Sequence, residues 1–277
     1  MSEKENILDI IRNKISEADA ILITAGAGMG VDSGLPDFRG NEGFWKAYPI
    51  IKNLGISFSQ MANPEWFEND PELAWAFYGH RYNLYKETIP HDGFTMLKDL
   101  IKRKKQNYFI YTSNVDGQFQ KAGFDEEKIV EIHGSIHHFQ CKNSCTNSIW
   151  ESSIAKLDVD MQSFRALDIP KCKYCSTIAR PNILMFGDWG WIEKRTAKQE
   201  DRFYSWLQEK QLHNEKIVII ELGAGLAVPT IRMQGEQIAR KLNKAVLVRI
   251  NPRDDEIPDT LGYSIKDGAL NGLRKIL

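Results

Sequence analysis

Residues 20–40 read AILITAGAGMGVDSGLPDFRG, and this stretch decides the fold. The run at 21–24 is short, apolar and rich in β-branched residues, which is typical of a buried parallel strand. Four glycines follow within 26–34, where the backbone can turn sharply and approach a ligand closely. A strand that ends in such a turn predicts the start of a dinucleotide site. The usual Gly-x-Gly-x-x-Gly spacing is only half met, because Val31 stands in the third position, so a strand-turn-helix without a ligand stays open.

Composition narrows the class of protein. The chain has 277 residues, of which 42% are hydrophobic and 26% charged, and its net charge is -1. These values are typical of a globular protein with one large domain or a domain with a smaller insertion. The near-neutral charge argues against a nucleic-acid partner, although residues 102–105 form a basic cluster. A polar N-terminus and the lack of a long apolar run predict a cytoplasmic protein that does not enter a membrane.

Alternating strand and helix patterns predict an α/β fold with a doubly wound, Rossmann-like parallel sheet. Strands are expected at 21–24, 108–112, 129–131, 216–222 and 245–250, and helices at 5–18, 94–105 and 230–243. Two stretches break the alternation, one rich in aromatic residues and one that holds all four cysteines. We therefore expect a dinucleotide-binding domain at 1–41, 93–136 and 181–277, with a helical insertion at 42–92 and a cysteine-containing insertion at 137–180 forming a smaller domain.

The cysteines come in two close pairs, Cys141-x3-Cys145 and Cys172-x2-Cys175. A reducing cytosol favours metal ligands over disulfides, and four thiolates suit a tetrahedral structural zinc with no open position. The first spacing is one residue longer than the common Cys-x2-Cys, and 26 residues separate the pairs. Free thiols therefore remain the alternative to a zinc site.

Polar residues follow two of the predicted strands, at the sheet edge where ligands of open α/β sheets bind. Asn114 and Asp116 would point the same way on an extended backbone and could contact an amide or a ribose, while a turn-forming pair is the alternative. His133 follows the strand at 129–131. An ordinary imidazole pKa near 6.5 suits general-base work at neutral pH, although a lone histidine is more often structural.

On a helix, Tyr78 and Arg81 would share one face, because they are three residues apart. A guanidinium next to a phenol hydroxyl is suited to holding a carboxylate. The alternative is an ordinary packing pair.

In their order along the chain, these motifs resemble those of the sirtuins, the NAD-consuming protein lysine deacylases. The stretch GAGMGVDSGLPDFRG is similar to the family signature Gly-Ala-Gly-x-Ser-x-x-Ser-Gly-Ile-Pro-x-Phe-Arg, and TSNVDGQFQKAG at 112–123 to Thr-Gln-Asn-Ile-Asp-Gly-Leu-His-x-x-Ala-Gly. His133-Gly134 looks like the family His-Gly pair, and the cysteines stand where the family has a zinc ribbon. Residues 180–191 resemble the segment that pairs with the substrate peptide, and 223–229 the loop that binds phosphate and adenosine.

The resemblance implies an NAD-dependent protein lysine deacylase that takes acyl-lysine proteins or peptides and uses NAD and zinc. The implied catalytic residues are His133, which would deprotonate a ribose hydroxyl, with Asn114 and Asp116. The implied cofactor-binding residues are Gly26, Ala27, Gly28, Asp37, Phe38, Arg39, Ser113, Asn114, Asp116, Gly223, Ala224, Gly225 and Asn251. The implied substrate-binding residues are Tyr78, Arg81, Val115, Phe186 and Gly187, and the implied zinc ligands are Cys141, Cys145, Cys172 and Cys175. The Tyr-x-x-Arg spacing marks the sirtuins that remove succinyl groups, so the implied activity is deacetylation or desuccinylation.

Several positions depart from the family pattern. Ser113 replaces a Gln that orders the cofactor ribose, Ala224 and Gly225 replace a Thr-Ser pair, and Gly30 replaces a Ser. Looser cofactor contacts keep an NAD glycohydrolase or ADP-ribosyltransferase open as the alternative, and a non-catalytic NAD-sensing module as a further one. Trp189 and Trp191, within the segment that resembles the peptide-pairing one, are either substrate contacts or packing residues.

Overall fold

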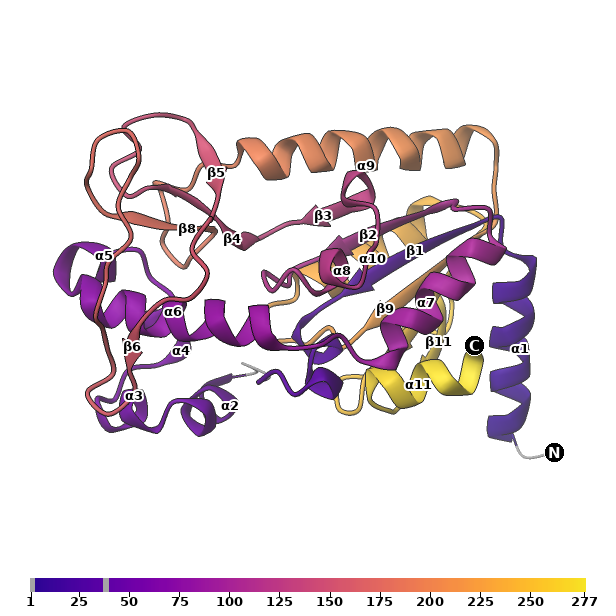
Figure 1. Ribbon diagram of the computed structural model, residues 1–277. Coiled ribbons are helices and arrows are strands. Elements are labelled where there is room, and N and C mark those ends of the chain that lie inside the picture. The colour runs from indigo at the N-terminus through magenta and orange to yellow at the C-terminus, as the bar shows by residue number, and fades with distance from the viewer. Residues whose placement is uncertain (1–2, 37–39) are drawn as a thin grey trace.

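The computed structural model describes residues 3–36 and 40–277 (Figure 1). Its largest sheet has six parallel strands in the order β11-β10-β9-β1-β2-β3. Their bounds are β1 Ala20–Ala25, β2 Tyr108–Thr112, β3 Ile129–Glu131, β9 Ile217–Leu222, β10 Ala245–Ile250 and β11 Gly262–Ile265. The four strands β1, β2, β3 and β9 are buried throughout, as expected of parallel strands covered on both faces. The predicted Rossmann-like sheet is confirmed, and its strand order reverses between β1 and β9.

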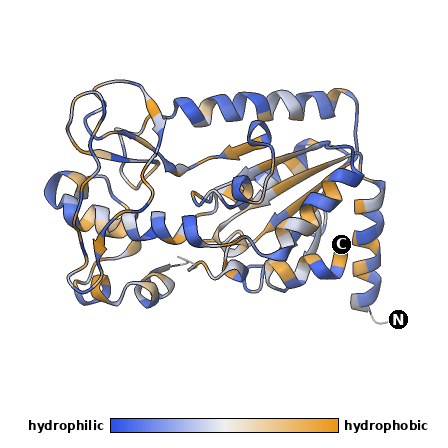
Figure 2. Ribbon diagram, in the orientation of Figure 1, coloured by the Kyte–Doolittle hydropathy of each residue, from blue (hydrophilic) through white to orange (hydrophobic). Residues whose placement is uncertain are grey.

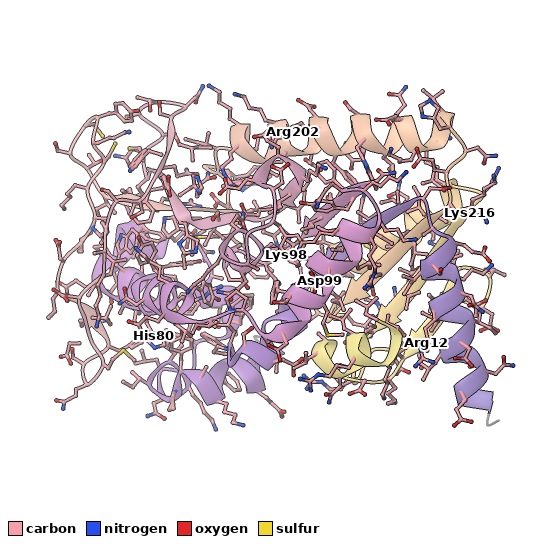
Figure 3. The ribbon with its side chains drawn as sticks, turned by 45° about the vertical axis from the view of Figure 1, so that its right-hand side comes forward. Arg12, His80, Lys98, Asp99, Arg202 and Lys216 are labelled. Carbon is pink, nitrogen blue, oxygen red and sulfur yellow. The ribbon has the colours of Figure 1, made fainter. Side chains whose placement is uncertain are left out.

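Helices cover both faces of this sheet. One face carries α1 (Glu3–Glu17), α7 (Asp92–Arg103) and α11 (Ala269–Ile276), and the other carries α9 (Lys194–Leu212) and α10 (Thr230–Lys241). Alternate residues of β1 serve the two faces: Ile21 and Ile23 pack with the first group of helices and Leu22 with the second. Figure 2 shows the apolar strands between helices whose outer sides are hydrophilic. Charged side chains such as Arg12 and Arg202 lie on the outside of these layers (Figure 3).

The two insertions together form a smaller module with its own core. Its helices are α2 Gly40–Ala47, α3 Pro49–Asn53, α4 Phe58–Met61, α5 Trp66–Asn69 and α6 Pro71–Glu87. Its strands are β4 Gly134–Cys141, β5 Ile149–Glu151 and β8 Ala179–Ile183, which form an antiparallel sheet in the order β5-β4-β8, and the hairpin β6 Val159–Asp160 with β7 Arg165–Ala166. Trp75 on α6 packs against Phe139 on β4, with ring centroids 5.2 Å apart. The helical and cysteine-containing segments therefore share one hydrophobic cluster.

Short helices complete the described chain, namely η1 Ala27–Met29, η2 Val31–Ser33, α8 Gln118–Lys121 and η3 Glu126–Lys128. The predicted cysteine-containing insertion began at residue 137 and ended at residue 180. In the structure, β4 runs across the first of these limits and β8 across the second. Within the described ranges, no helix combines the length and apolar character needed to cross a bilayer.

Candidate active site

A cavity of about 310 Å³ lies beyond the carboxyl ends of β1, β2 and β9, between the sheet and the smaller module. This is the switch point of the strand order, where ligands of open α/β sheets bind. The predicted site residues that line it are Gly26, Ala27, Tyr78, Arg81, Ser113, Asn114, Val115, Asp116, His133, Phe186, Gly223, Ala224 and Gly225. The sequence motifs are therefore brought together in one cleft.

Two glycine turns form the floor of the cleft. Gly26 follows β1, and a Cβ there would lie 2.9 Å from Ala224 Cα. Gly223 follows β9 with a φ of +61°, and a Cβ there would lie 2.4 Å from Gly28 Cα. The Gly28 N–H donates to the Gly223 carbonyl at 3.0 Å. Only glycine permits this close approach, which presses the two turns into one surface.

Asn251 and Gly28 support these turns and do not line the cavity in the described chain. The buried Asn251 amide donates to the Ala224 carbonyl at 2.7 Å, and its Oδ1 accepts from the N–H groups of Arg253 and Asp254. Asn251 thus fixes the turn after β9. Gly187 also lies outside the cavity lining, with a φ of +69°. The predicted contacts Asp37, Phe38 and Arg39 lie outside the described residues.

The loop after β2 is bonded to the turn after β1. The Ser113 N–H donates to the Ala25 carbonyl at 3.1 Å, and Asn114 Nδ2 donates to the Gly26 carbonyl at 3.0 Å. This pairing places both residues against the glycine turns. Asn114 thus holds a residue 88 positions away, whereas Asp116 accepts from the Gln118 N–H two residues on, as in a local turn.

His133 follows β3 and lines the same cavity as Asn114. Burial lowers the pKa of its imidazole, while the main-chain carbonyl of Ser113 acts in the opposite direction. The ring is therefore neutral at neutral pH. A neutral imidazole has one ring nitrogen without a proton, which can accept one, as a general base requires.

Asp116 lies deeper, and only 8% of its surface is exposed. Burial raises the pKa of its carboxyl to about 6, and the positive charge of Arg81 acts to lower it. Its Oδ1 accepts from the Gln118 N–H at 2.9 Å, which aims the carboxylate. At neutral pH it is a buried anion beside the cavity.

Arg81 and Tyr78 come from α6 and line the cavity with Tyr85. Arg81 Nε donates to the Tyr85 hydroxyl at 3.0 Å, and the guanidinium carbon lies 5.4 Å from the Tyr85 ring centroid. Burial raises the pKa of Tyr78 to about 12, so its hydroxyl stays protonated. A cation and two phenols thus converge on one part of the cleft. Sequence reasoning missed Tyr85, although it is four residues after Arg81 and so shares its helix face.

The mouth of the cavity is apolar. Leu184 and Phe186 follow β8 and are 39% and 44% exposed. The Leu184 N–H donates to the His133 carbonyl at 2.9 Å, and the Phe186 N–H donates to the Ala62 carbonyl at 2.9 Å. The Phe186 ring also meets Phe58 of α4 edge-on, with centroids 6.1 Å apart. The segment after β8 therefore joins the histidine loop to the helical part of the smaller module.

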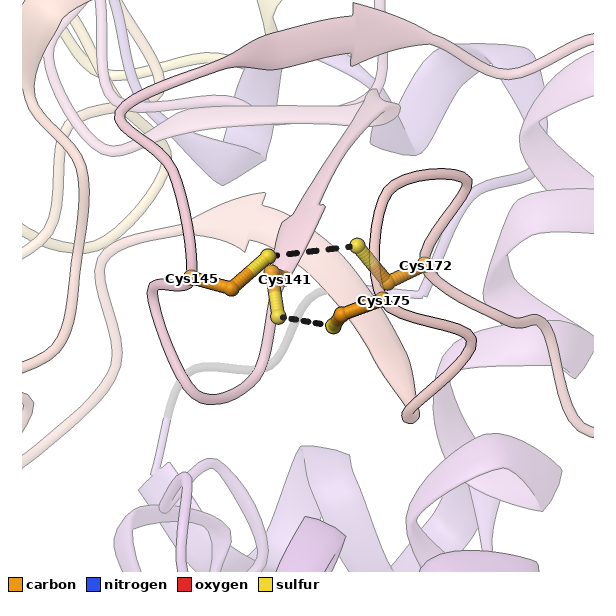
Figure 4. Close-up of side chains that lie close together, drawn as sticks. All are labelled: Cys141, Cys145, Cys172 and Cys175. Atoms are coloured by element: carbon orange, nitrogen blue, oxygen red, sulfur yellow. Dashed lines mark hydrogen bonds between the residues drawn. The ribbon is translucent and has the colours of Figure 1, made fainter.

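The four cysteines form one cluster, with Cys141 at the end of β4 and the other three on loops (Figure 4). Their sulfurs lie within 4.8 Å of one another, with Cys141–Cys175 at 3.6 Å and Cys145–Cys172 at 3.7 Å. Four thiolates at about 2.3 Å from a central zinc would be about 3.8 Å apart, so the cluster fits this metal. The Thr177 hydroxyl lies 3.0 Å from Cys175 Sγ, as an outer hydrogen-bonding partner of a ligand would. The cluster does not line the cavity, which fits a structural metal.

Fold and site together define a doubly wound α/β protein with a ligand cleft at its switch point and a four-thiolate ribbon beside it. The sequence profile of the Sir2 family matches residues 26–228. The chain belongs to the Sir2 family, which confirms the resemblance to sirtuins.

Two curated relatives span most of the chain. An NAD-dependent protein deacylase of Aquifex aeolicus is 28% identical over 257 residues, which cover 92% of this chain and 93% of the relative. An NAD-dependent protein deacylase of Deinococcus radiodurans is 26% identical and covers 96% of both chains. Among solved structures, the complex of a Sir2 homologue with NAD has a TM-score of 0.72 and 22% identity, and it covers 97% of this chain and 91% of that chain. This last similarity confirms the fold.

Proposed function

We propose that this protein is an NAD-dependent protein lysine deacylase. The observation that carries the proposal is the convergence of His133, Asn114 and Asp116 on the two glycine turns in one cleft. His133 follows β3, whereas Asn114 and Asp116 follow β2. A Sir2-family protein that had lost catalytic activity would have no need to keep these residues in one cleft. The curated relatives from Aquifex and Deinococcus, both named NAD-dependent protein deacylases, support the same activity.

NAD, when bound, supplies a ribose carbon open to attack and nicotinamide as the leaving group. The turns at Gly26–Ala27 and 223–225 would hold its phosphates and adenosine, as their close approach leaves main chain facing the cleft. Asn114 and Asp116 would bind the nicotinamide amide, since a carboxylate accepts from its N–H groups. Holding both reactants in one cleft makes their encounter effectively unimolecular.

His133 would take the proton from the ribose hydroxyl that receives the acyl group. Its lowered pKa keeps the imidazole neutral, so that it can accept this proton. The main-chain carbonyl of Ser113, which acts to raise that pKa, would stabilise the protonated ring.

The acyl-lysine would enter between Phe186 and Val115, and its acyl group would extend toward Arg81. Arg81 and the protonated hydroxyl of Tyr78 are suited to a carboxylate, which favours succinyl over acetyl as the acyl group. The four cysteines would hold zinc as a structural ion. Such a reduced thiol cluster also fits a cytoplasmic enzyme.

The test is an assay of nicotinamide release with NAD and matched acetyl-lysine or succinyl-lysine peptides. We expect release to depend on peptide and to yield one deacylated peptide per nicotinamide. Release at the same rate without peptide would instead support the NAD glycohydrolase, which the small residues Ser113, Ala224 and Gly225 in the cavity wall favour. NAD binding with no release under any condition would support the NAD-sensing module.

A further inference from the structure

Trp189 is the most exposed large apolar residue of the described chain. Its exposure is 99%, whereas the other six tryptophans are buried or half-buried. A tryptophan gains about 150–250 Å² of burial when a partner covers it, so full exposure on a free surface is unfavourable. Trp189 therefore does no packing in this structure.

The turn that carries Trp189 is held rigidly. The neighbouring Asp188 side chain has 0% exposure and pairs with Arg180, which is 2% exposed. Asp188 also accepts from the N–H groups of Met185 and Gly190, at 3.3 and 3.1 Å. Removing either partner of a buried ion pair is strongly destabilising, so these bonds hold the turn in the conformation seen here.

A second set of contacts ties the turn to the cysteine ribbon. The Gly190 carbonyl accepts from Gln140 Nε2 at 2.7 Å and from the Ser144 hydroxyl at 3.3 Å. Gln140 and Ser144 lie on either side of Cys141. The exposed indole thus projects from a backbone fixed on both sides, which removes the ordering cost that a flexible loop would add on binding.

The turn adjoins the mouth of the candidate active site. Trp189 lies three residues after Phe186, and Leu184 and Phe186 form an apolar rim there. Three residues of chain span at most about 11 Å, and an extended peptide rises about 3.3 Å per residue, so a side chain two or three positions from the acyl-lysine could reach the indole. Between the rim and the indole the chain has only Gly187 and Asp188, whose side chain is buried.

We propose that Trp189 is a specificity-determining residue that binds an apolar side chain of the protein substrate, two or three positions from the acyl-lysine. This inference rests on the proposed deacylase function. The partner is an extended substrate segment with an aliphatic or aromatic residue at that position. Rigid aromatic residues at the edge of a binding site are frequent hot spots.

The experiment uses heptapeptides with a central acyl-lysine, in which a single leucine moves through the three positions on each side and the remaining residues are alanine. The variants are Trp189→Ala, Trp189→Phe and, as a control, Leu212→Ala, whose side chain is 76% exposed at the end of α9. In the parent protein, leucine at one position should lower KM by about tenfold, the effect of roughly 1.4 kcal/mol. Trp189→Ala should abolish this preference with kcat unchanged, Trp189→Phe should restore most of it, and Leu212→Ala should match the parent.

An equal leucine preference in the parent and Trp189→Ala overturns the proposal, as does a parent protein without any positional preference. If no peptide supports turnover, the deacylase function fails, and calorimetric binding of the same peptides then decides the role of Trp189. Tighter binding of one leucine peptide that is lost in Trp189→Ala supports the role, and identical or absent binding overturns it.

Discussion

Replacing Asp116 by Asn should make the folded protein lose less stability as the pH rises. Burial raises the pKa of this carboxyl from 3.8 to about 6, so the folded chain favours its neutral form. Below about pH 4 the Asp116 carboxyl is protonated in both the folded and the unfolded chain and has little effect on stability. At higher pH it ionises more readily in the unfolded chain, so it destabilises the fold. One pKa unit corresponds to about 1.4 kcal/mol, which gives on the order of 3 kcal/mol at pH 8. About half of this develops between pH 5 and pH 8.

The substitution Asp116→Asn removes the ionisation but keeps an oxygen that can accept from the Gln118 N–H. The difference in thermal midpoint between variant and parent should therefore shift in favour of the variant by about 3 to 5 °C between pH 5 and pH 8. Because the measurement is a change in a difference, a constant cost of the substitution cancels. Asp99→Asn, on the exposed surface of α7, serves as the control and should show no such shift.

The same variant tests the catalytic role. At pH 8, loss of the charged acceptor should slow acyl-lysine-dependent nicotinamide release by about tenfold or more. If Asp116→Asn gains stability relative to the parent at high pH and also releases nicotinamide more slowly, the charge of Asp116 serves function at a cost in stability. An equal midpoint difference at both pH values would refute the assignment of a raised pKa to Asp116.

Three further predictions concern the other parts of the site. Arg81→Met should lower the ratio of desuccinylation to deacetylation by about tenfold or more, measured as kcat/KM on matched peptides, and an unchanged ratio would exclude Arg81 from acyl selection. His133→Ala should lose about 10²- to 10⁴-fold in deacylation while the Kd for NAD from calorimetry stays within a few-fold, and a large loss of NAD affinity would instead make the histidine a binding residue. Cys175→Ser should release zinc, detected with a chromogenic chelator, and lower the thermal midpoint, whereas Tyr174→Ala, one residue away, should keep both.

Much of the sheet could be predicted because its strands carry strong local signals. The strands β2, β3 and β10 lie at the predicted residues, since each is a short apolar run in the sequence. β11 was not predicted, because it has only four residues, lies at the edge of the sheet and is only partly buried. The helix α9 was not predicted either, because its sequence is largely polar, with Phe203 and Leu207 as isolated core positions.

The site was less predictable where side chains act at a distance in sequence. The contact of Asn251 with the cofactor stays a prediction, but the hydrogen bond from its amide to the Ala224 carbonyl, 27 residues earlier, could not be foreseen from the sequence. The effect of the Ser113 carbonyl on the pKa of His133 has no sequence signal either, because a main-chain acceptor is present at every residue. Trp189 could be read as packing or contact from sequence, and only its exposure separates the two.

The strands β4 and β8 explain why a structural metal would affect the proposed reaction although it takes no part in the chemistry. β4 begins at Gly134, directly after His133, and β8 ends at Ile183, directly before the apolar rim. A Cβ at Gly134 would lie 2.0 Å from the Asn182 carbonyl oxygen, so the two strands touch at this point. The same pair of strands reaches the cysteine cluster at its other end, where Cys141 closes β4. Fixing the cluster would therefore fix the spacing between the proposed general base and the proposed peptide-binding segment. Loss of the metal should then raise KM for peptide before it weakens binding of NAD to the glycine turns.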